Sequence, residues 1–333
     1  MTRSINFGLW YDFRNPGHQV SFEKLYRDSL DQIAWAETIG FDSVWLTEHH
    51  FVQDGYCPSP LVVAAAIGER TTRMRIGTNL MLLPLADPVR LAEDAAALAI
   101  LTGGRFDLGV GLGYRQLEFD YFGRKISHRP SLMEEGVSII RQAWSGEPIS
   151  HHGKRYDIED IKVSPTPESI PRLLMGGMAE PAIDRAARLG DGFLSTGGIG
   201  LEEYTSAAKR AGRDAAIYAG HWGIIADDPE KEAVEVGGNV LYQTNEYISW
   251  GAFGPPAETP LFENSESAIA GGLYELMDGA GAIEALTTLL LGHPGIKDIH
   301  FWAQFPGESV EHGSRRIEYI ANHVLPAVRK NIS

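Results

Sequence analysis

Residues 40–51 read GFDSVWLTEHHF, and this stretch decides the fold that we expect. Gly40 is typical of the residue just past a helix, and Asp42–His50 has the apolar, β-branched and aromatic composition of a strand. The strand closes with Glu48, His49 and His50, which are polar and titratable. A helix, a buried strand and then polar residues is the order typical of a parallel sheet wrapped by helices.

The same alternation continues on both sides of this stretch. Further strand patterns lie at Ile5–Phe13, Arg75–Pro84, Phe106–Tyr114, Arg172–Met178, Gly192–Gly198, His221–Asp227 and Asp298–Phe305. Helical patterns separate them, for instance Pro60–Arg70, Pro181–Leu189 and the apolar face of Ile317–Val328. We therefore predict an α/β fold, a single (β/α)8 TIM barrel spanning residues 1–333.

Two additions to the barrel are expected. His151–Pro167 reads as a hairpin inserted after the fourth strand, and residues 115–130 before it read as a loop. Residues 228–297, between the seventh and eighth strands, form a segment longer than one crossover helix requires. Its middle, Trp250–Pro256, looks like a mobile loop, so we predict that the segment is a lid.

Composition narrows the functional class. The 333 residues carry 29 Lys and Arg against 44 Asp and Glu, a formal net charge of −15, which disfavours nucleic acid and anionic membranes. No apolar run reaches the length of a membrane span, and the N-terminus lacks the apolar core of a signal peptide. The one cysteine, Cys57, suits a reducing compartment. These features predict a cytoplasmic enzyme acting on a small molecule.

The strand ends are where a barrel places its chemistry. Glu48 beside His49 and His50 supplies groups for acid–base work near neutral pH, although one packed and one solvated histidine would explain the pair equally well. No metal site is expected, because the two histidines point to opposite faces of the strand.

Glycines mark three other strand ends. The fourth strand closes with GVGLGY at 109–114, the fifth with Gly176, Gly177 and Met178, and the sixth with Ser195 and Thr196 before two more glycines. Bare backbone lets a flat ring approach, and glycines before a helix N-terminus can cradle a phosphate. Relief of crowding and turn formation are the alternatives.

These motifs, in this order, resemble the bacterial luciferase-like flavin-dependent monooxygenases. The resemblance is carried by the segment at 40–51, RIGT at 75–78, LP at 83–84 with DPVR at 87–90, GRF at 104–106 and AARLGDG at 186–192. It covers residues 5–200 well and the last third by layout alone. It implies an α/β barrel with an insertion that binds a flavin.

Site residues follow from the resemblance position by position. It implies that His49 lies near the flavin ring, with Glu48 or backbone holding its tautomer, and that Asn79–Leu80 is a cis peptide behind the ring. Gly111 replaces the reactive cysteine of luciferase, and Leu112 replaces an arginine near the flavin phosphate. The further cofactor residues that we predict are Arg129, Gly176, Gly177, Met178, Ser195 and Thr196, with backbone N–H groups of 177–179 beside the phosphate. Trp10, Trp302 and Phe305 are predicted walls of the substrate pocket.

The leading function implied by the resemblance is a two-component monooxygenase. A separate reductase would supply reduced FMN, since no nicotinamide fingerprint is present, and O2 would form a C4a-peroxyflavin that oxygenates a small organic substrate. The first alternative is an F420-dependent oxidoreductase that transfers a hydride, for which Arg115, Arg124, Lys125 and Arg129 could line a groove for the acidic tail. The second is a non-catalytic flavin-binding partner subunit. The resemblance also implies a homodimer.

Overall fold

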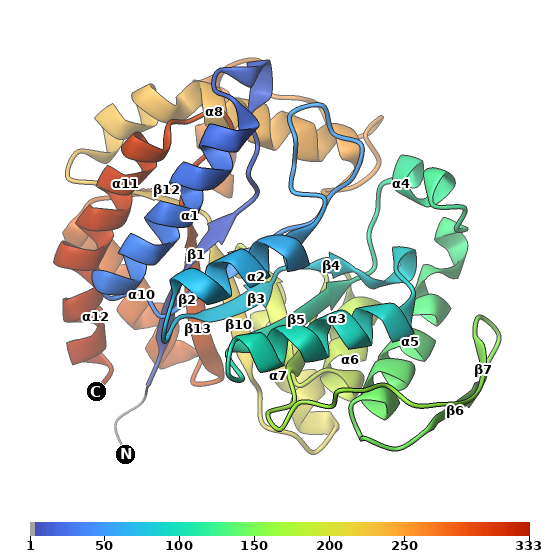
Figure 1. Cartoon of the computed structure of the whole chain (residues 1–333). Helices are drawn as coiled ribbons and strands as arrows, with labels where there is room; N and C mark the ends of the chain where they lie inside the picture. Colours follow the sequence, from blue (N-terminus) through green and yellow to red (C-terminus); the bar gives the residue numbers. More distant parts are fainter. Residues whose placement is uncertain (1–3) are drawn as a thin grey trace.

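The computed structural model describes residues 4–333 and contains a closed parallel barrel (Figure 1). Its eight strands pair around the ring as β1, β2, β3, β5, β8, β9, β10 and β13, and β13 returns to β1. This confirms the predicted TIM barrel. The strands are β1 (Asn6–Tyr11), β2 (Ser43–Leu46), β3 (Arg75–Thr78), β5 (Phe106–Gly111), β8 (Arg172–Gly176), β9 (Gly192–Thr196), β10 (Ile217–His221) and β13 (Ile296–Trp302), with the two-residue β4 (Met81–Leu82) also pairing with β5.

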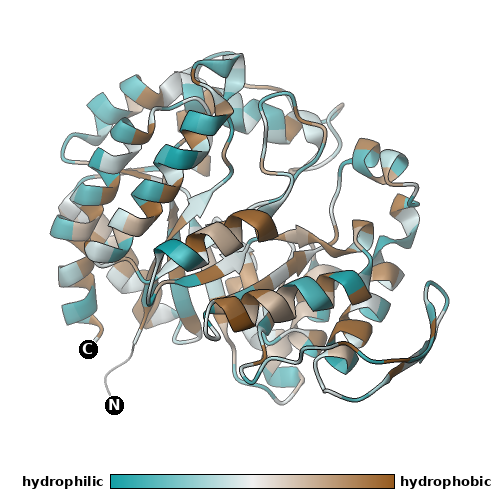
Figure 2. Ribbon diagram, viewed as in Figure 1, coloured by the Kyte–Doolittle hydropathy of each residue, from teal (hydrophilic) through white to brown (hydrophobic). Residues whose placement is uncertain are grey.

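Helices surround the strands and bury one face each. Most of them show both hydrophilic and hydrophobic residues along their length in Figure 2, as amphipathic helices do. Sequence signals set their ends: Ser21 and Asp87 cap α1 and α3 by accepting hydrogen bonds from backbone N–H groups of the first turn. The helices are α1 (Phe22–Thr38), α2 (Pro60–Arg70), α3 (Pro88–Leu101), α4 (Gln116–Tyr121), α5 (Arg129–Ala143), α6 (Glu180–Leu189), α7 (Leu201–Arg210), α8 (Pro229–Trp250), α9 (Ser265–Ala268), α10 (Gly279–Gly292), α11 (Val310–Tyr319) and α12 (Leu325–Asn331).

The insertion after the fourth barrel strand is an antiparallel hairpin, β6 (Ile149–His152) with β7 (Asp157–Ile161). It projects from the rest of the fold in Figure 1. The long segment at 228–297 is largely regular: it holds α8, α9, α10 and the strand β12 (Glu275–Met277). That it moves as a lid stays a prediction.

Several element boundaries differ from the sequence-based expectation. The seventh barrel strand is Ile217–His221 and not His221–Asp227, because Gly223–Ile225 forms a separate strand, β11, that leaves the barrel and pairs with β12. Periodicity cannot separate two short apolar runs that meet at a bend. Within the expected loop at 115–130 lies the helix α4, whose six residues are too few to show a helical period. The second strand ends at Leu46, so the polar residues after it lie beyond the ladder.

One ionic cluster ties three neighbouring strands together at the start of the barrel. The Asp107 carboxylate in β5 is buried and accepts hydrogen bonds from Arg75 Nη2 in β3 (2.7 Å) and from Arg172 Nε in β8 (2.8 Å). Since the pairing of β3 with β5 is only two residues long, these bonds add to the closure of the ring.

In the part of the chain that the structure describes, no helix combines the length and apolar character that crossing a bilayer requires.

Because β5 lies so close to the end of β3, adding a single methyl group to Gly109 is expected to lower the stability of the fold. A Cβ on Gly109 would lie 1.9 Å from the Thr78 carbonyl oxygen and 2.6 Å from Leu194 Cδ1. Because a backbone atom cannot shift cheaply, Gly109→Ala should lower the free energy of unfolding by at least about 3 kcal/mol, measured by urea denaturation.

Gly238→Ala is the matched control. Gly238 lies inside α8, and a Cβ there would meet nothing within 4 Å. Alanine has less conformational freedom than glycine in the unfolded chain, so the substitution should raise the free energy of unfolding by about 0.5–1 kcal/mol. Equal stability of the two variants would contradict the packing described for Gly109.

Candidate active site

A cavity of about 380 Å³ opens at the carboxyl ends of the barrel strands. Residues at or after the ends of β1, β2, β3, β5, β8 and β9 contribute to its wall, and Tyr247 in α8 with the Gly251–Phe253 turn closes another side. The wall is mostly aromatic and aliphatic. Its position is the one at which TIM barrels carry out chemistry.

The structure brings most of the predicted site residues together at this cavity. Those that line it are Trp10, Glu48, His49, Asn79, Leu80, Arg129, Gly176, Gly177, Met178 and Thr196. They come from separate parts of the sequence, so the closed barrel is what places them around one space.

Four predicted residues do not line the cavity. Gly111 lies behind Leu80, since a Cβ there would meet Leu80 Cδ1 at 2.4 Å. Ser195 is buried, and its hydroxyl donates to the Ile199 carbonyl oxygen. Trp302 stacks on Trp10 at a centroid distance of 4.3 Å and so supports the wall from behind. Phe305 is also fully buried.

His49 is held through both ring nitrogens. Nδ1 lies 2.9 Å from Glu118 Oε1, and Nε2 lies 3.0 Å from the Tyr114 hydroxyl. A carboxylate only accepts hydrogen bonds, so Nδ1 carries the hydrogen and Nε2 of the neutral ring accepts from Tyr114. The expectation that Glu48 or backbone holds this tautomer is therefore wrong: the carboxylate comes from α4.

The charge state of the pair follows from its surroundings. Burial lowers the pKa of His49 below its ordinary value, although the nearby Glu118 carboxylate acts in the opposite direction. Burial alone would raise the pKa of Glu118, but the hydrogen bonds from His49 and from the His50 backbone N–H, with the charge of Arg115, hold it below its usual range. At neutral pH the pair is an ionised carboxylate and a neutral imidazole.

Glu48 serves a different purpose. Its Oε2 accepts a hydrogen bond from the Leu82 backbone N–H (2.5 Å), and its Oε1 lies 3.2 Å from His50 Nε2. It thereby fastens the end of β2 to the segment that follows β3. His50 does not line the cavity; its ring packs edge-on against Phe122.

A chain of polar side chains runs from Asn79 at the cavity to buried residues inside the barrel. The Asn79–Leu80 peptide bond is cis, as the resemblance implied. The Asn79 side-chain amide lies 2.9 Å from His300 Nε2, and His300 Nδ1 lies 3.0 Å from Asp298 Oδ1. His300 and Asp298 are fully buried inside the barrel. This chain of contacts fixes the direction in which the Asn79 amide faces the cavity.

Two arginines hold the end of α8 against the site. The Arg115 guanidinium lies 4.4 Å from the centroid of the Trp250 ring, and the fully buried Arg14 guanidinium lies 5.0 Å from it. Arg115 also donates to Glu118 Oε1 (3.0 Å), and Arg14 donates to Asp54 Oδ2 (2.6 Å). Trp250 packs edge-on against His49, so these cation–π contacts connect α8 to the catalytic candidate.

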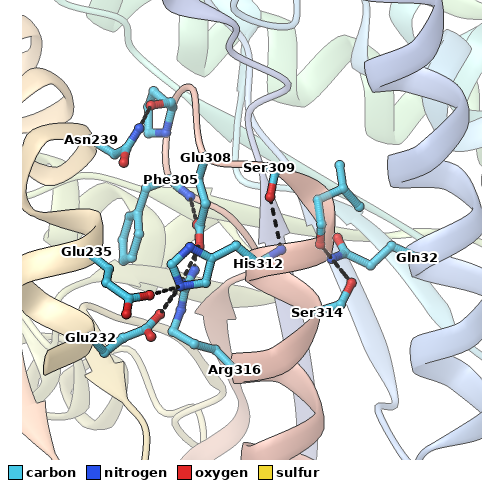
Figure 3. Close-up of polar contacts among 12 residues, drawn as sticks. Gln32, Glu232, Glu235, Asn239, Phe305, Glu308, Ser309, His312, Ser314 and Arg316 are labelled. Atoms are coloured by element: carbon cyan, nitrogen blue, oxygen red, sulfur yellow. Dashed lines mark hydrogen bonds and ion pairs between the residues drawn. The ribbon is translucent and has the colours of Figure 1, made fainter. Parts of the chain in front are cut away.

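A second cluster of titratable residues lies away from the cavity, where α8 meets α11. Glu232, Glu308 and His312 present one ligand-type atom each within 4.8 Å of one another. Figure 3 shows Arg316 among them, and its guanidinium donates to both Glu308 and Glu232. Arg316 therefore supplies the positive charge that a metal ion would otherwise bring to these carboxylates, and the cluster fastens α8 to α11.

Several functional candidates escaped the sequence analysis. Glu118 and Tyr114 act on His49 although they stand 69 and 65 residues from it along the chain. A weak signal exists for the first, because Arg115 and Glu118 are spaced as an ion pair on one helical face. Tyr56 and Tyr247, whose hydroxyls lie 3.0 Å apart at the cavity, carry no such signal.

Comparison with known proteins gives the family that this chain matches. The family described as luciferase-like monooxygenase matches residues 5–285. An F420-dependent glucose-6-phosphate dehydrogenase of Amycolatopsis mediterranei (strain U-32) is 31% identical over 210 residues, which cover 60% of this chain and 62% of that protein. The chain spans 52%, 62% and 64% of the length of three curated relatives, of which the second and third are F420-dependent glucose-6-phosphate dehydrogenases.

Solved structures agree in fold over nearly the whole chain. A monooxygenase from Streptomyces bottropensis superposes with a TM-score of 0.82 at 24% identity, covering 97% of this chain and 99% of that one. The oxygenating constituent of 3,6-diketocamphane monooxygenase from Pseudomonas putida, a type II Baeyer–Villiger monooxygenase in complex with FMN, gives 0.78 at 19% identity, covering 97% and 99%.

The contact between His49 and Glu118 predicts a measurable titration. Glu118→Gln removes the negative charge that favours the imidazolium, so the pKa of His49 should fall further below its ordinary value. Histidine-selective NMR across a pH series measures this. Glu93→Gln, which alters an exposed carboxylate on α3, is the control and should leave the His49 titration unchanged; a rise in the pKa of His49 in Glu118→Gln would contradict the assignment.

Proposed function

Because the chain belongs to the luciferase-like monooxygenase family, we propose that it is a flavin-dependent monooxygenase that uses reduced FMN and O2 to oxygenate a small organic molecule. The observation that carries the proposal is the cavity itself: a largely apolar space whose described lining includes the cation Arg129 and a buried, neutral histidine. A separate reductase is the proposed source of reduced FMN, as the sequence lacks a nicotinamide fingerprint. A homodimer stays a prediction.

The residues present fit an FMN ring. Leu80, Gly176 and Gly177 line the cavity, and the two glycines have no side chain that would keep a ring from the backbone. A Cβ on Gly176 would lie 2.6 Å from Leu80 Cδ2, so a larger residue would push that side chain into the cavity. The cis peptide at Asn79–Leu80 lies at the same part of the wall.

A phosphate also has a place at this cavity. Arg129 lines it and donates one hydrogen bond, to the Gly113 carbonyl oxygen (2.9 Å), while a guanidinium has five N–H donors. Ala179 and Ala182, at the N-terminus of α6, lie along the same wall, where the helix dipole favours an anion. Arg129 and the start of α6 would together hold the phosphate.

Bound FMN would supply the redox chemistry with O2. The chain itself would contribute an enclosed cavity and residues that can accept a proton. Trp10, Trp222 and Phe253 keep water from the reacting centre, and the His49–Glu118 pair stands ready to accept a proton because burial keeps the imidazole neutral.

F420-dependent hydride transfer is the second candidate, favoured by the F420-dependent relative named above. The charges at the cavity favour FMN. Among its described lining residues Arg129 is the one cation, which matches the single phosphate of FMN. The acidic tail of F420 would need more, and of the other basic residues that the sequence offered, Lys125 is exposed and Arg115 is engaged with Glu118 and Trp250.

Cofactor titration tests the proposal directly. Anaerobic titration of the purified chain with FMN, reduced FMN and F420, followed by tryptophan fluorescence and binding heat, should show reduced FMN binding at least tenfold more tightly than F420. Trp10 and Trp222 at the cavity provide the fluorescence signal. Tight F420 binding with weak binding of both forms of FMN would contradict the monooxygenase proposal and support F420-dependent hydride transfer.

The phosphate site has its own test. Arg129→Ala should weaken FMN binding about tenfold or more, because a charge-assisted hydrogen bond contributes about 1.5–3 kcal/mol, and should leave riboflavin binding unchanged. Arg124→Ala, in the same segment, is the matched control, since Arg124 does not line the cavity. Equal losses for FMN and riboflavin would place the phosphate elsewhere.

A further inference from the structure

His49 has no nitrogen left for a reacting molecule. Nδ1 is hydrogen-bonded to Glu118 and Nε2 to the Tyr114 hydroxyl, as described above. His49 is 5% exposed, whereas Tyr114 is half-buried and lines the cavity. His49 also lines the cavity, but both of its ring nitrogens are engaged, so the polar group through which a reacting molecule can reach the imidazole is the phenol of Tyr114.

The direction of these hydrogen bonds is set by the carboxylate. Glu118 Oε1 accepts from His49, from the His50 backbone N–H (2.8 Å) and from Arg115 (3.0 Å). Since the Nδ1 hydrogen points to Glu118, Tyr114 donates its own hydrogen to Nε2. The phenol oxygen keeps its remaining lone-pair capacity for a donor in the cavity. The arrangement is thus ready to accept a proton and has none to donate.

Tyr114 cannot act alone. Burial, with Tyr247 and Glu118 nearby, raises the pKa of Tyr114 well above its ordinary value against the opposing charges of Arg115 and Arg14. A free tyrosinate is therefore not formed at neutral pH. The phenol can accept a proton only as it passes its own to His49, whose resulting positive charge Glu118 stabilises.

The rest of the wall indicates what kind of molecule presents that proton. Trp10, Trp222, Phe253, Tyr56 and Tyr247 give the cavity broad aromatic surfaces. Arg129 is the one cation among the described lining residues, and the proposed function assigns it to the cofactor phosphate. An anionic substrate would therefore lack a counter-charge, whereas an uncharged ring compound would bury its surface against these rings.

We propose that Tyr114 is the catalytic residue that takes the proton from the substrate, and that the substrate is an uncharged, ring-bearing hydroxy compound of the phenol or enol type. The substrate O–H bond breaks as its proton moves to the Tyr114 oxygen, and the Tyr114 proton moves to His49 Nε2. The products are a bound phenolate or enolate and an imidazolium paired with Glu118. This inference rests on the proposed function for its place in oxygenation, but the proton relay stands on contacts within the chain.

The first test uses the cofactor-free chain, so the choice between FMN and F420 does not enter. Histidine-selective nitrogen NMR should show His49 with its hydrogen on Nδ1 and an accepted hydrogen bond at Nε2. Tyr114→Phe removes the donor that favours the neutral ring, so the Nε2 signal should shift and the pKa of His49 should rise. Tyr121→Phe removes a hydroxyl that is exposed on α4 and serves as the matched control. A hydrogen on Nε2, or a Tyr114→Phe spectrum equal to that of the wild type, overturns the relay.

The second test addresses the substrate class with a matched pair of probes. 2-Naphthol should bind the cofactor-free wild type about tenfold more tightly than its methyl ether, in line with one hydrogen bond, and Tyr114→Phe should lose this preference while keeping the wild-type melting temperature. Tyr121→Phe should keep the preference. Equal binding of the two probes, a preference that persists in Tyr114→Phe, or failure of both probes to bind overturns the substrate class.

Discussion

The Glu118 carboxylate is the contact on which the arrangement of the site depends. One of its oxygens accepts from the His49 ring, from the backbone after it and from Arg115, so a single buried charge joins the end of β2 to α4. Arg115 in turn stacks on Trp250 at the end of α8. Without that charge the imidazole would lose its fixed tautomer, and Arg115 would lose the partner that directs it toward α8.

The helix α8 is held at both of its ends, and this explains how a long segment outside the barrel shapes the cavity. Near its start, Glu232 accepts from Arg316, which also holds Glu308 (Figure 3). At its other end Trp250 contacts the Arg14 and Arg115 guanidinium groups. Both attachments are buried or half-buried ion pairs and cation–π contacts, which bulk water screens less than surface pairs. The turn at 251–253 can therefore line the cavity in a defined position.

The cavity separates two kinds of chemistry along one wall. The side formed by Arg129 and the start of α6 suits an anion, while the side formed by Trp10, Trp222 and Tyr247 suits an uncharged ring. The proposed proton acceptor, Tyr114 with His49, lines the same cavity. An uncharged ring compound is the substrate class that we propose for this lining.

The sequence by itself determined the barrel, the insertion after the fourth strand and part of the cavity wall. It could do so because strand and helix periods are local, and because polar or glycine-rich residues directly after a strand must lie at the same edge of a parallel barrel. It also predicted the family, which the match over residues 5–285 confirms. Only the tertiary structure decided which partners the site residues take. Glu118 and Tyr114 reach His49 across 69 and 65 residues, Arg14 reaches Trp250 from the segment after β1, and β11 leaves the barrel to pair with β12. Such pairings depend on how the ring closes and on which buried charges meet, and neither leaves a period or a spacing in the sequence.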